Sequence, residues 1–175
     1  MRARYDRPEA SEHAADYASY IARVPDGDVV QVLQTQVEEL GRLLAGHPES
    51  RGDYAYAPGK WTLKEVLGHL IDSERVFSFR ALWIGRGDPA PLPGFDENRW
   101  APNSGARNRT LSNLIEELKA VRAATVTLLR HLPPEAATRR GVANNNPVTV
   151  RALAWIMAGH VLHHERLIRE RYLAP

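Results

Sequence analysis

The sequence contains no cysteine among its 175 residues. Disulfide bonds, Fe–S clusters, cysteine-based zinc sites and cysteine nucleophiles are therefore excluded. Apolar runs are short, and none approaches the roughly 20 residues that a membrane-spanning helix needs. No apolar stretch follows the first six residues, Met1–Asp6, so we expect no secretory signal. These absences favour a cytoplasmic protein without a membrane partner.

An excess of charge of one sign is also lacking, because 23 basic residues face 21 acidic ones. The arginines are dispersed among apolar residues and no nucleic-acid-binding module is recognisable, so we expect no nucleic acid partner. No phosphate-binding glycine loop and no Gly-x-Ser-x-Gly motif occurs, which leaves nucleotide binding and serine hydrolysis without support. The His-Glu-x-x-His motif is absent too, because Ile168 stands where its second histidine would follow His164-Glu165.

Strand signals are nearly absent, whereas four long segments repeat apolar residues with a helical period. The predicted helices cover residues 28–45, 62–84, 110–132 and 149–172. The clearest start is the capping box Thr62-Leu63-Lys64-Glu65. These segments predict an all-α fold without a sheet, an up-down-up-down four-helix bundle over residues 28–175.

Two further segments lie outside the predicted helices. Residues 1–27 are expected to form an N-terminal extension, with a short helix over about residues 8–21. Residues 86–109 form a long proline-rich loop between the second and third helices. Loops of this length in a compact domain usually carry function or cover a site.

Histidines within the second and fourth predicted helices are the strongest candidate site. His160 and His164 are four residues apart and fall on the stripe Leu153, Met157, His160, His164, Ile168, which is the buried face of its helix. His69 borders the apolar stripe of the second helix, at a matching height in an antiparallel pair. The pattern predicts that His69, His160 and His164 bind one divalent cation; the alternative is a set of core histidines that only pack. His163 lies about 60° from His160 on a helical wheel and is a weaker candidate.

Three histidine ligands without cysteine are typical of a catalytic metal site, which keeps a position open for water or substrate. Asp72, one turn from His69, is the tentative base or supporting carboxylate. Asp96 and Glu97 lie on the long loop, where Phe95 and Trp100 are candidates to line a pocket. Arg99, Arg107 and Arg109 are candidates to hold an anionic substrate group. Solvation at the surface is the alternative interpretation for each charged residue.

The motifs Gly59-Lys60-Trp61-Thr62, Gly68-His69-Leu70 and Gly159-His160-x-x-His163-His164 resemble the DinB-like superfamily, which includes the YfiT-like metal-dependent hydrolases. The segment Pro93-Gly94-Phe95-Asp96-Glu97-Asn98 is similar to one subgroup. The resemblance covers about residues 28–173. It implies a four-helix bundle, often dimeric, with zinc or nickel held by His69, His160 and His164. It also implies small-molecule chemistry, in some members with a low-molecular-weight thiol such as mycothiol or bacillithiol.

Three functional hypotheses remain open at this point. The first is a metal-dependent enzyme, either a hydrolase or a thiol-dependent transferase, whose thiol must come from outside because the chain has no cysteine. The second is a non-catalytic metal-binding or stress-response bundle, and the third is a metal-free bundle that acts through dimerisation. A homodimer is expected, mainly from the resemblance.

Overall fold

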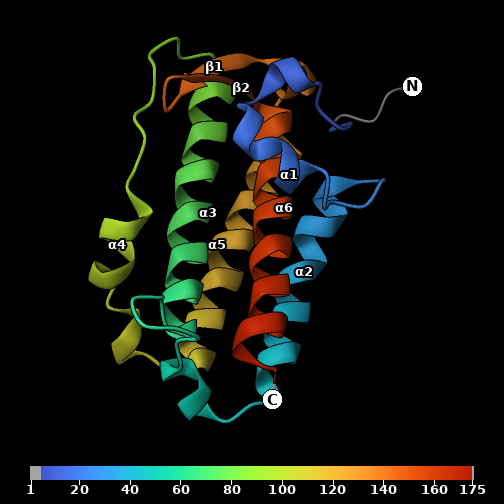
Figure 1. Cartoon of the computed structure of the whole chain (residues 1–175). Coiled ribbons are helices and arrows are strands. Elements are labelled where there is room, and N and C mark those ends of the chain that lie inside the picture. Colours follow the sequence, from blue (N-terminus) through green and yellow to red (C-terminus); the bar gives the residue numbers. More distant parts are fainter. Residues whose placement is uncertain (1–4, 175) are drawn as a thin grey trace.

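The computed structural model describes residues 5–174, and four long helices form its body (Figure 1). Each helix begins at a side chain that caps its first turn: Asp28, Thr62, Thr110 and Thr149. The helices are α2 (Val29–Ala45), α3 (Leu63–Gly85), α5 (Leu111–His131) and α6 (Val150–Leu167), and a π-helical turn over Ile168–Tyr172 extends the last one. The predicted four-helix bundle is confirmed, with ends that differ by only a residue or two.

The directions of the helices differ from the predicted up-down-up-down order. Arg107, just before α5, pairs with Glu65 at the start of α3, and Leu132, just after α5, packs on Gly85 at the end of α3. Helices α3 and α5 are therefore parallel, and the order along the chain is down-up-up-down (Figure 1). Each helix contacts two neighbours, so that α2 lies diagonally opposite α3 and α5 diagonally opposite α6.

The long loop makes this arrangement possible. A 23-residue helix is about 35 Å long, whereas the chain over residues 86–110 reaches about 80 Å when extended. The connection therefore has enough length to return along the whole of α3 before α5 begins. It contains one short helix, α4 (Glu97–Asn103), which packs against α3.

A β-hairpin contradicts the prediction that the chain has no sheet. Strands β1 (Arg140–Ala143) and β2 (Asn146–Thr149) pair antiparallel and lead directly into α6. Asn144 and Asn145 both have positive φ angles, 51° and 60°, as a two-residue type I′ turn requires. Asparagine tolerates this conformation better than most residues, so the Asn-Asn pair is the local cause of the hairpin.

The N-terminal segment is an integral part of the bundle. Instead of the single helix expected over residues 8–21, it forms short turns followed by the one-turn helix α1 (Ala18–Ile21), which packs on α6. Tyr5 donates a hydrogen bond to the Leu129 carbonyl, 2.7 Å away. Short 3₁₀ turns complete the connections, at Ala10–Glu12, Ala15–Tyr17, Glu49–Asp53, Ala106–Asn108 and Pro134–Thr138.

A buried polar layer divides the apolar core into two clusters. Arg122 of α5 makes a bidentate ion pair with Glu74 of α3, over 2.7 and 2.9 Å. The same guanidinium donates to the Leu33 carbonyl and to Gln36 of α2. Gln36 in turn donates to the Ala158 carbonyl of α6, so the layer connects all four long helices. No helix in residues 5–174 combines the length and apolar character needed to cross a bilayer.

Candidate metal centre

Three histidines converge where α3 faces α6. His69 comes from α3, and His160 and His164 come from successive turns of α6. One ring nitrogen from each residue lies within 4.8 Å of those of the other two. The Nε2 atoms of His69 and His160 are 3.0 Å apart, and all three residues are at most 8% exposed. The structure thus brings together the three residues that the sequence singled out as metal ligands.

Aromatic side chains hold the cluster from both sides. Trp61, the residue before the cap of α3, packs on His69 with 4.9 Å between ring centroids. Its carbonyl accepts a hydrogen bond of 2.8 Å from the buried Tyr172 hydroxyl, which fixes this segment to the end of α6. On the other side, the ring of Tyr20 from α1 lies 5.5 Å from the ring of His160. The imidazoles are therefore held by packing rather than left free to rotate.

Burial keeps the three imidazoles neutral at physiological pH. It lowers the pKa of His69 to about 4 and that of His164 to about 3, with a smaller contribution from repulsion by neighbouring histidines. The pKa of His160 lies well below its usual range, first because of burial and then because of His164. A neutral imidazole has a free nitrogen lone pair, and this is the form that binds a metal ion.

The polar atoms of the cluster fit a single cation. The Nδ1 atom of His164 is buried and has no hydrogen-bond partner in the described part of the chain. His69 directs Nε2 to the cluster and Nδ1 toward the Ser73 hydroxyl, 3.4 Å away, as a metal-bound histidine does with its second nitrogen. Nitrogens on one tetrahedral zinc are about 3.4 Å apart, so the observed separations need only a small adjustment.

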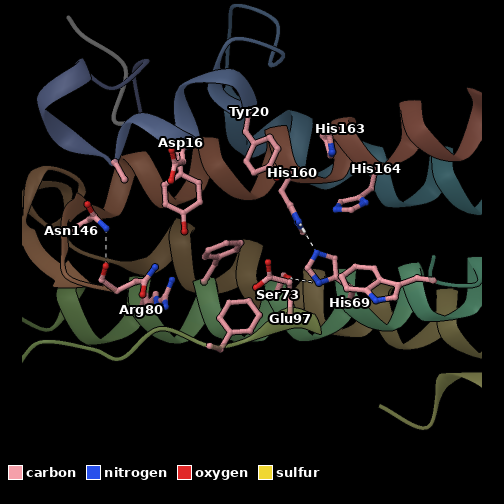
Figure 2. A pocket seen from close by; sticks show the side chains of 16 residues that line it. Asp16, Tyr20, His69, Ser73, Arg80, Glu97, Asn146, His160, His163 and His164 are labelled. Carbon is pink, nitrogen blue, oxygen red and sulfur yellow. Dashed lines mark hydrogen bonds between the residues drawn. The ribbon is translucent and has the colours of Figure 1, made fainter. Parts of the chain in front are cut away.

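The three histidines lie at one end of an elongated cavity of about 370 Å³ (Figure 2). Helices α3 and α6 form its floor and one wall, and the N-terminal segment, the long loop and the hairpin complete it. The lining side chains beyond the three histidines include Asp16, Tyr17, Tyr20, Trp61, Ser73, Phe77, Arg80, Phe95, Glu97, Asn144, Asn146 and His163. A cavity of this size suits a small organic molecule.

Residues 32–168, more than three quarters of the chain, match the DinB superfamily. The chain belongs to the DinB superfamily. A protein of Oceanobacillus iheyensis named "putative metal-dependent hydrolase" is 23% identical over 134 residues, which are 75% of this chain and 76% of that protein. A Geobacillus thermodenitrificans protein of the same name is 25% identical over 95 residues, 54% of this chain and 53% of its own length.

Two solved structures share the fold of this DinB-superfamily chain. YfiT from Bacillus subtilis, described as "a probable metal-dependent hydrolase with an unusual four-helix bundle topology", superposes with a TM-score of 0.72 and 21% identity, over 85% of this chain and 90% of YfiT. A mycothiol-dependent maleylpyruvate isomerase superposes with a TM-score of 0.67 and 14% identity, over 83% of this chain and 61% of the isomerase. At these identities the likeness establishes the fold alone.

The carboxylates predicted from the sequence have different positions. Asp72 does not line the cavity with the three histidines; it borders separate hollows on another side of α3. This geometry gives no support to its expected role as base. Glu97 of α4 does line the cavity, whereas Asp96 caps α4 by accepting a hydrogen bond from the Arg99 amide.

Of the residues expected to line the pocket or to bind anions, only one lines the cavity of the three histidines. Phe95 lines the cavity, but Trp100 lies over the separate hollow beside Asp72. Arg107 and Arg109 are engaged in ion pairs with Glu65 and Glu117. Arg99 is exposed and does not line the cavity of the three histidines.

Several cavity residues were missed by the sequence reasoning. Tyr17 and Tyr20 belong to the N-terminal segment, outside the residues that match the superfamily, and no motif marks them. Arg80 lies on α3 eleven residues after His69, and eleven residues are just over three full helical turns. Its position on the same helix face as His69 was a signal present in the sequence.

Proposed function

We propose that this chain is a metal-dependent enzyme whose divalent cation, zinc or nickel, is held by His69, His160 and His164. The observation that carries the proposal is the convergence of three buried, neutral imidazoles, one of which, His164, has a buried Nδ1 atom without a hydrogen-bond partner in residues 5–174. When bound, such a cation supplies a Lewis acid that lowers the pKa of a coordinated water or thiol. The adjoining cavity favours catalysis over a purely structural site, because it gives a small molecule access to the histidines.

We assign the proton acceptor of the site to Glu97. Its carboxylate lines the cavity, and its charge contributes to the raised pKa of Tyr20, after the larger effects of burial and of Tyr17. Glu97 is also solvent-exposed, so a proton that it accepts is released readily to water. The raised pKa keeps the Tyr20 phenol protonated, and the hydroxyl is then a hydrogen-bond donor for an oxygen of the substrate.

Two reaction classes fit these groups: hydrolysis, and transfer to a thiol. The names of the Oceanobacillus and Geobacillus relatives and of YfiT favour hydrolysis, and the mycothiol-dependent isomerase that shares the fold favours thiol chemistry. Because the chain has no cysteine, the thiol in the second class would be a separate small molecule. The shared requirement is a nucleophile that loses a proton inside the cavity, which is the step assigned to Glu97.

Metal analysis tests the ligand set directly. Protein purified without a histidine tag should contain about one divalent cation per chain, as three-histidine sites do. The variant His160→Ala should contain none. His163→Ala is the matched control, because His163 adjoins the cluster but is not among the three converging residues, and this variant should keep the metal. Metal retained by His160→Ala would contradict the proposal.

A substrate screen tests the catalytic assignment. Metal-loaded protein is assayed with activated esters and amides, and with electrophiles in the presence of low-molecular-weight thiols. The variant Glu97→Gln should keep its metal and lose roughly 100-fold in rate, the usual magnitude for loss of a general base. Metal-loaded wild type without any activity across both panels would favour the non-catalytic metal-binding bundle.

A further inference from the structure

Arg80 lies at the far end of the cavity from the three histidines. It follows His69 on α3 by eleven residues, which places it on the same helix face about 16 Å along the axis. The side chain lines the cavity and only 4% of the residue is exposed. Figure 2 shows Arg80 and Asn146 at one end of the cavity and the histidine cluster at the other.

The positive charge of Arg80 has no anionic partner among residues 5–174. None of the ion pairs formed within residues 5–174 involves Arg80. Its single hydrogen bond within the described part of the chain runs from Nη2 to the Pro93 carbonyl, 2.8 Å away. Arg122 shows the contrast, because this equally buried arginine has a bidentate carboxylate partner in Glu74. Four of the five N–H groups of Arg80 form no hydrogen bond within residues 5–174, and its nitrogens are not among the fully buried partnerless atoms, so these groups are open to a ligand in the cavity.

The surroundings of Arg80 hold its guanidinium in place for such a ligand. Its Cζ atom lies 5.7 Å from the Phe77 ring and 6.0 Å from the Phe95 ring. Both rings line the cavity, and the ring of Phe77 also lies 6.0 Å from the ring of His160. Asp16, the acidic residue at this end (Figure 2), is solvent-exposed, and none of the ion pairs within residues 5–174 joins it to Arg80. The aromatic packing and the free N–H groups of the planar guanidinium suit bidentate binding of a carboxylate.

Building on the function proposed for this site, we propose that Arg80 binds the carboxylate of the substrate while the reacting group of the same molecule lies at the three histidines. The substrate class is then a small, elongated carboxylic acid. Its middle portion is apolar or aromatic, because Tyr17, Phe77 and Phe95 line the same cavity. Arg80 is a specificity residue in this scheme, and the three histidines select the reacting group.

A matched pair of probes tests this assignment in the wild-type protein. Binding of 3-phenylpropionate and of its primary amide is measured by calorimetry on chelator-treated protein, so that no metal competes for the carboxylate. We expect the carboxylate to bind about tenfold or more tightly than the amide, because only the carboxylate forms charge-assisted bonds with Arg80. Equal affinity for the two probes would overturn the proposal.

Variants then locate the preference at Arg80. In Arg80→Gln the carboxylate should lose about tenfold or more in affinity while the amide is unaffected, and Arg80→Lys should be intermediate because it keeps the charge without the fork. Arg99→Gln is the matched control, since it removes an exposed charge outside the cavity, and it should bind both probes as wild type does. An unchanged preference in Arg80→Lys would overturn the proposal even if Arg80→Gln does not fold.

The outcome is separable from that of the metal proposal. Binding is measured without metal, so an Arg80-dependent carboxylate preference stands whether or not the histidines bind a cation. Conversely, wild type and Arg80→Lys could both contain metal as purified and yet show no carboxylate preference after chelation. That result would refute the role of Arg80 and leave the metal site intact.

Discussion

The backbone carbonyl oxygen of Tyr20 occupies the space that a side chain at Gly159 would need. A Cβ atom built on Gly159 would lie 2.1 Å from this oxygen. Only glycine lets α1 approach α6 so closely, and that approach places the Tyr20 ring against His160. The glycine beside the first histidine of α6 thus determines how one wall of the cavity is built.

The variant Gly159→Ala should therefore displace α1 from α6. Alanine is favoured over glycine within a helix by about 1 kcal/mol, but the clash is with backbone, which yields less easily than a flexible side chain. We expect a net loss of roughly 1–3 kcal/mol in the free energy of unfolding, measured by urea denaturation. Gly46→Ala is the control, because its Cβ would meet only the Leu43 carbonyl at 3.8 Å. A Gly159→Ala protein as stable as wild type would show that α1 is not held as described.

Removing one partner of the buried Arg122–Glu74 pair should be strongly destabilising. Glu74→Ala leaves the guanidinium buried without a counter-charge, and such changes typically cost about 3–5 kcal/mol. The double variant Glu74→Ala with Arg122→Met should recover part of this loss, because no uncompensated charge remains. Chemical denaturation of both single variants and the double variant gives the coupling free energy. A coupling near zero would contradict the ion pair.

The stability of the metal-free protein should fall as the pH falls below about 6.5. The folded-state pKa of His69 is about 4 and that of His164 about 3, whereas an unfolded histidine titrates near 6.5. The unfolded chain therefore binds more protons between these values, and folding becomes less favourable as the pH decreases. For His69 the loss is roughly 3 kcal/mol once the pH is below both values. Replacing His164 with Gln should make the free energy of unfolding depend less on pH. Denaturation between about pH 3 and 7, which spans the folded and unfolded pKa values, measures this dependence.

Metal removal should lower the melting temperature without unfolding the protein. The large apolar core does not depend on the metal site, so chelated protein should keep its helical circular dichroism. Free zinc at about 100 times its dissociation constant should add about 2.7 kcal/mol to the stability of wild type. His160→Ala should show no such gain under the same conditions. Complete loss of helix in chelator would indicate a structural rather than a catalytic metal.

The sequence predicted the helices and the histidine cluster well because both are encoded locally. The capping threonines Thr62 and Thr110 determine where two helices begin, and the four-residue spacing of His160 and His164 requires a shared helix face. His69 could be added because it too borders an apolar stripe. The geometry within single helices, together with the assumption that the second and fourth predicted helices pack against each other, was sufficient for this part of the site.

The rest depended on contacts between segments far apart in the sequence. The parallel arrangement of α3 and α5 follows from the route of the long loop, which residue periodicity does not report. The hairpin was missed although Asn144-Asn145 followed by Pro147-Val148 is a local turn signal. Tyr20 could not be placed at the site, because nothing in its own sequence neighbourhood indicates that the segment folds back onto Gly159.

The polar layer has a consequence for how the chain folds. The pairing of Arg122 with Glu74 joins residues 48 positions apart, its bond to Gln36 spans 86, and the bond from Gln36 to Ala158 spans 122. Where two of the four long helices pack together, no short turn connects them. The bundle therefore has few of the local contacts that let simple helical hairpins fold in microseconds. Chain closure must precede most of the stabilising contacts, and its entropic cost rises with each of these separations. This chain should therefore reach its native state more slowly than its helical content alone would suggest.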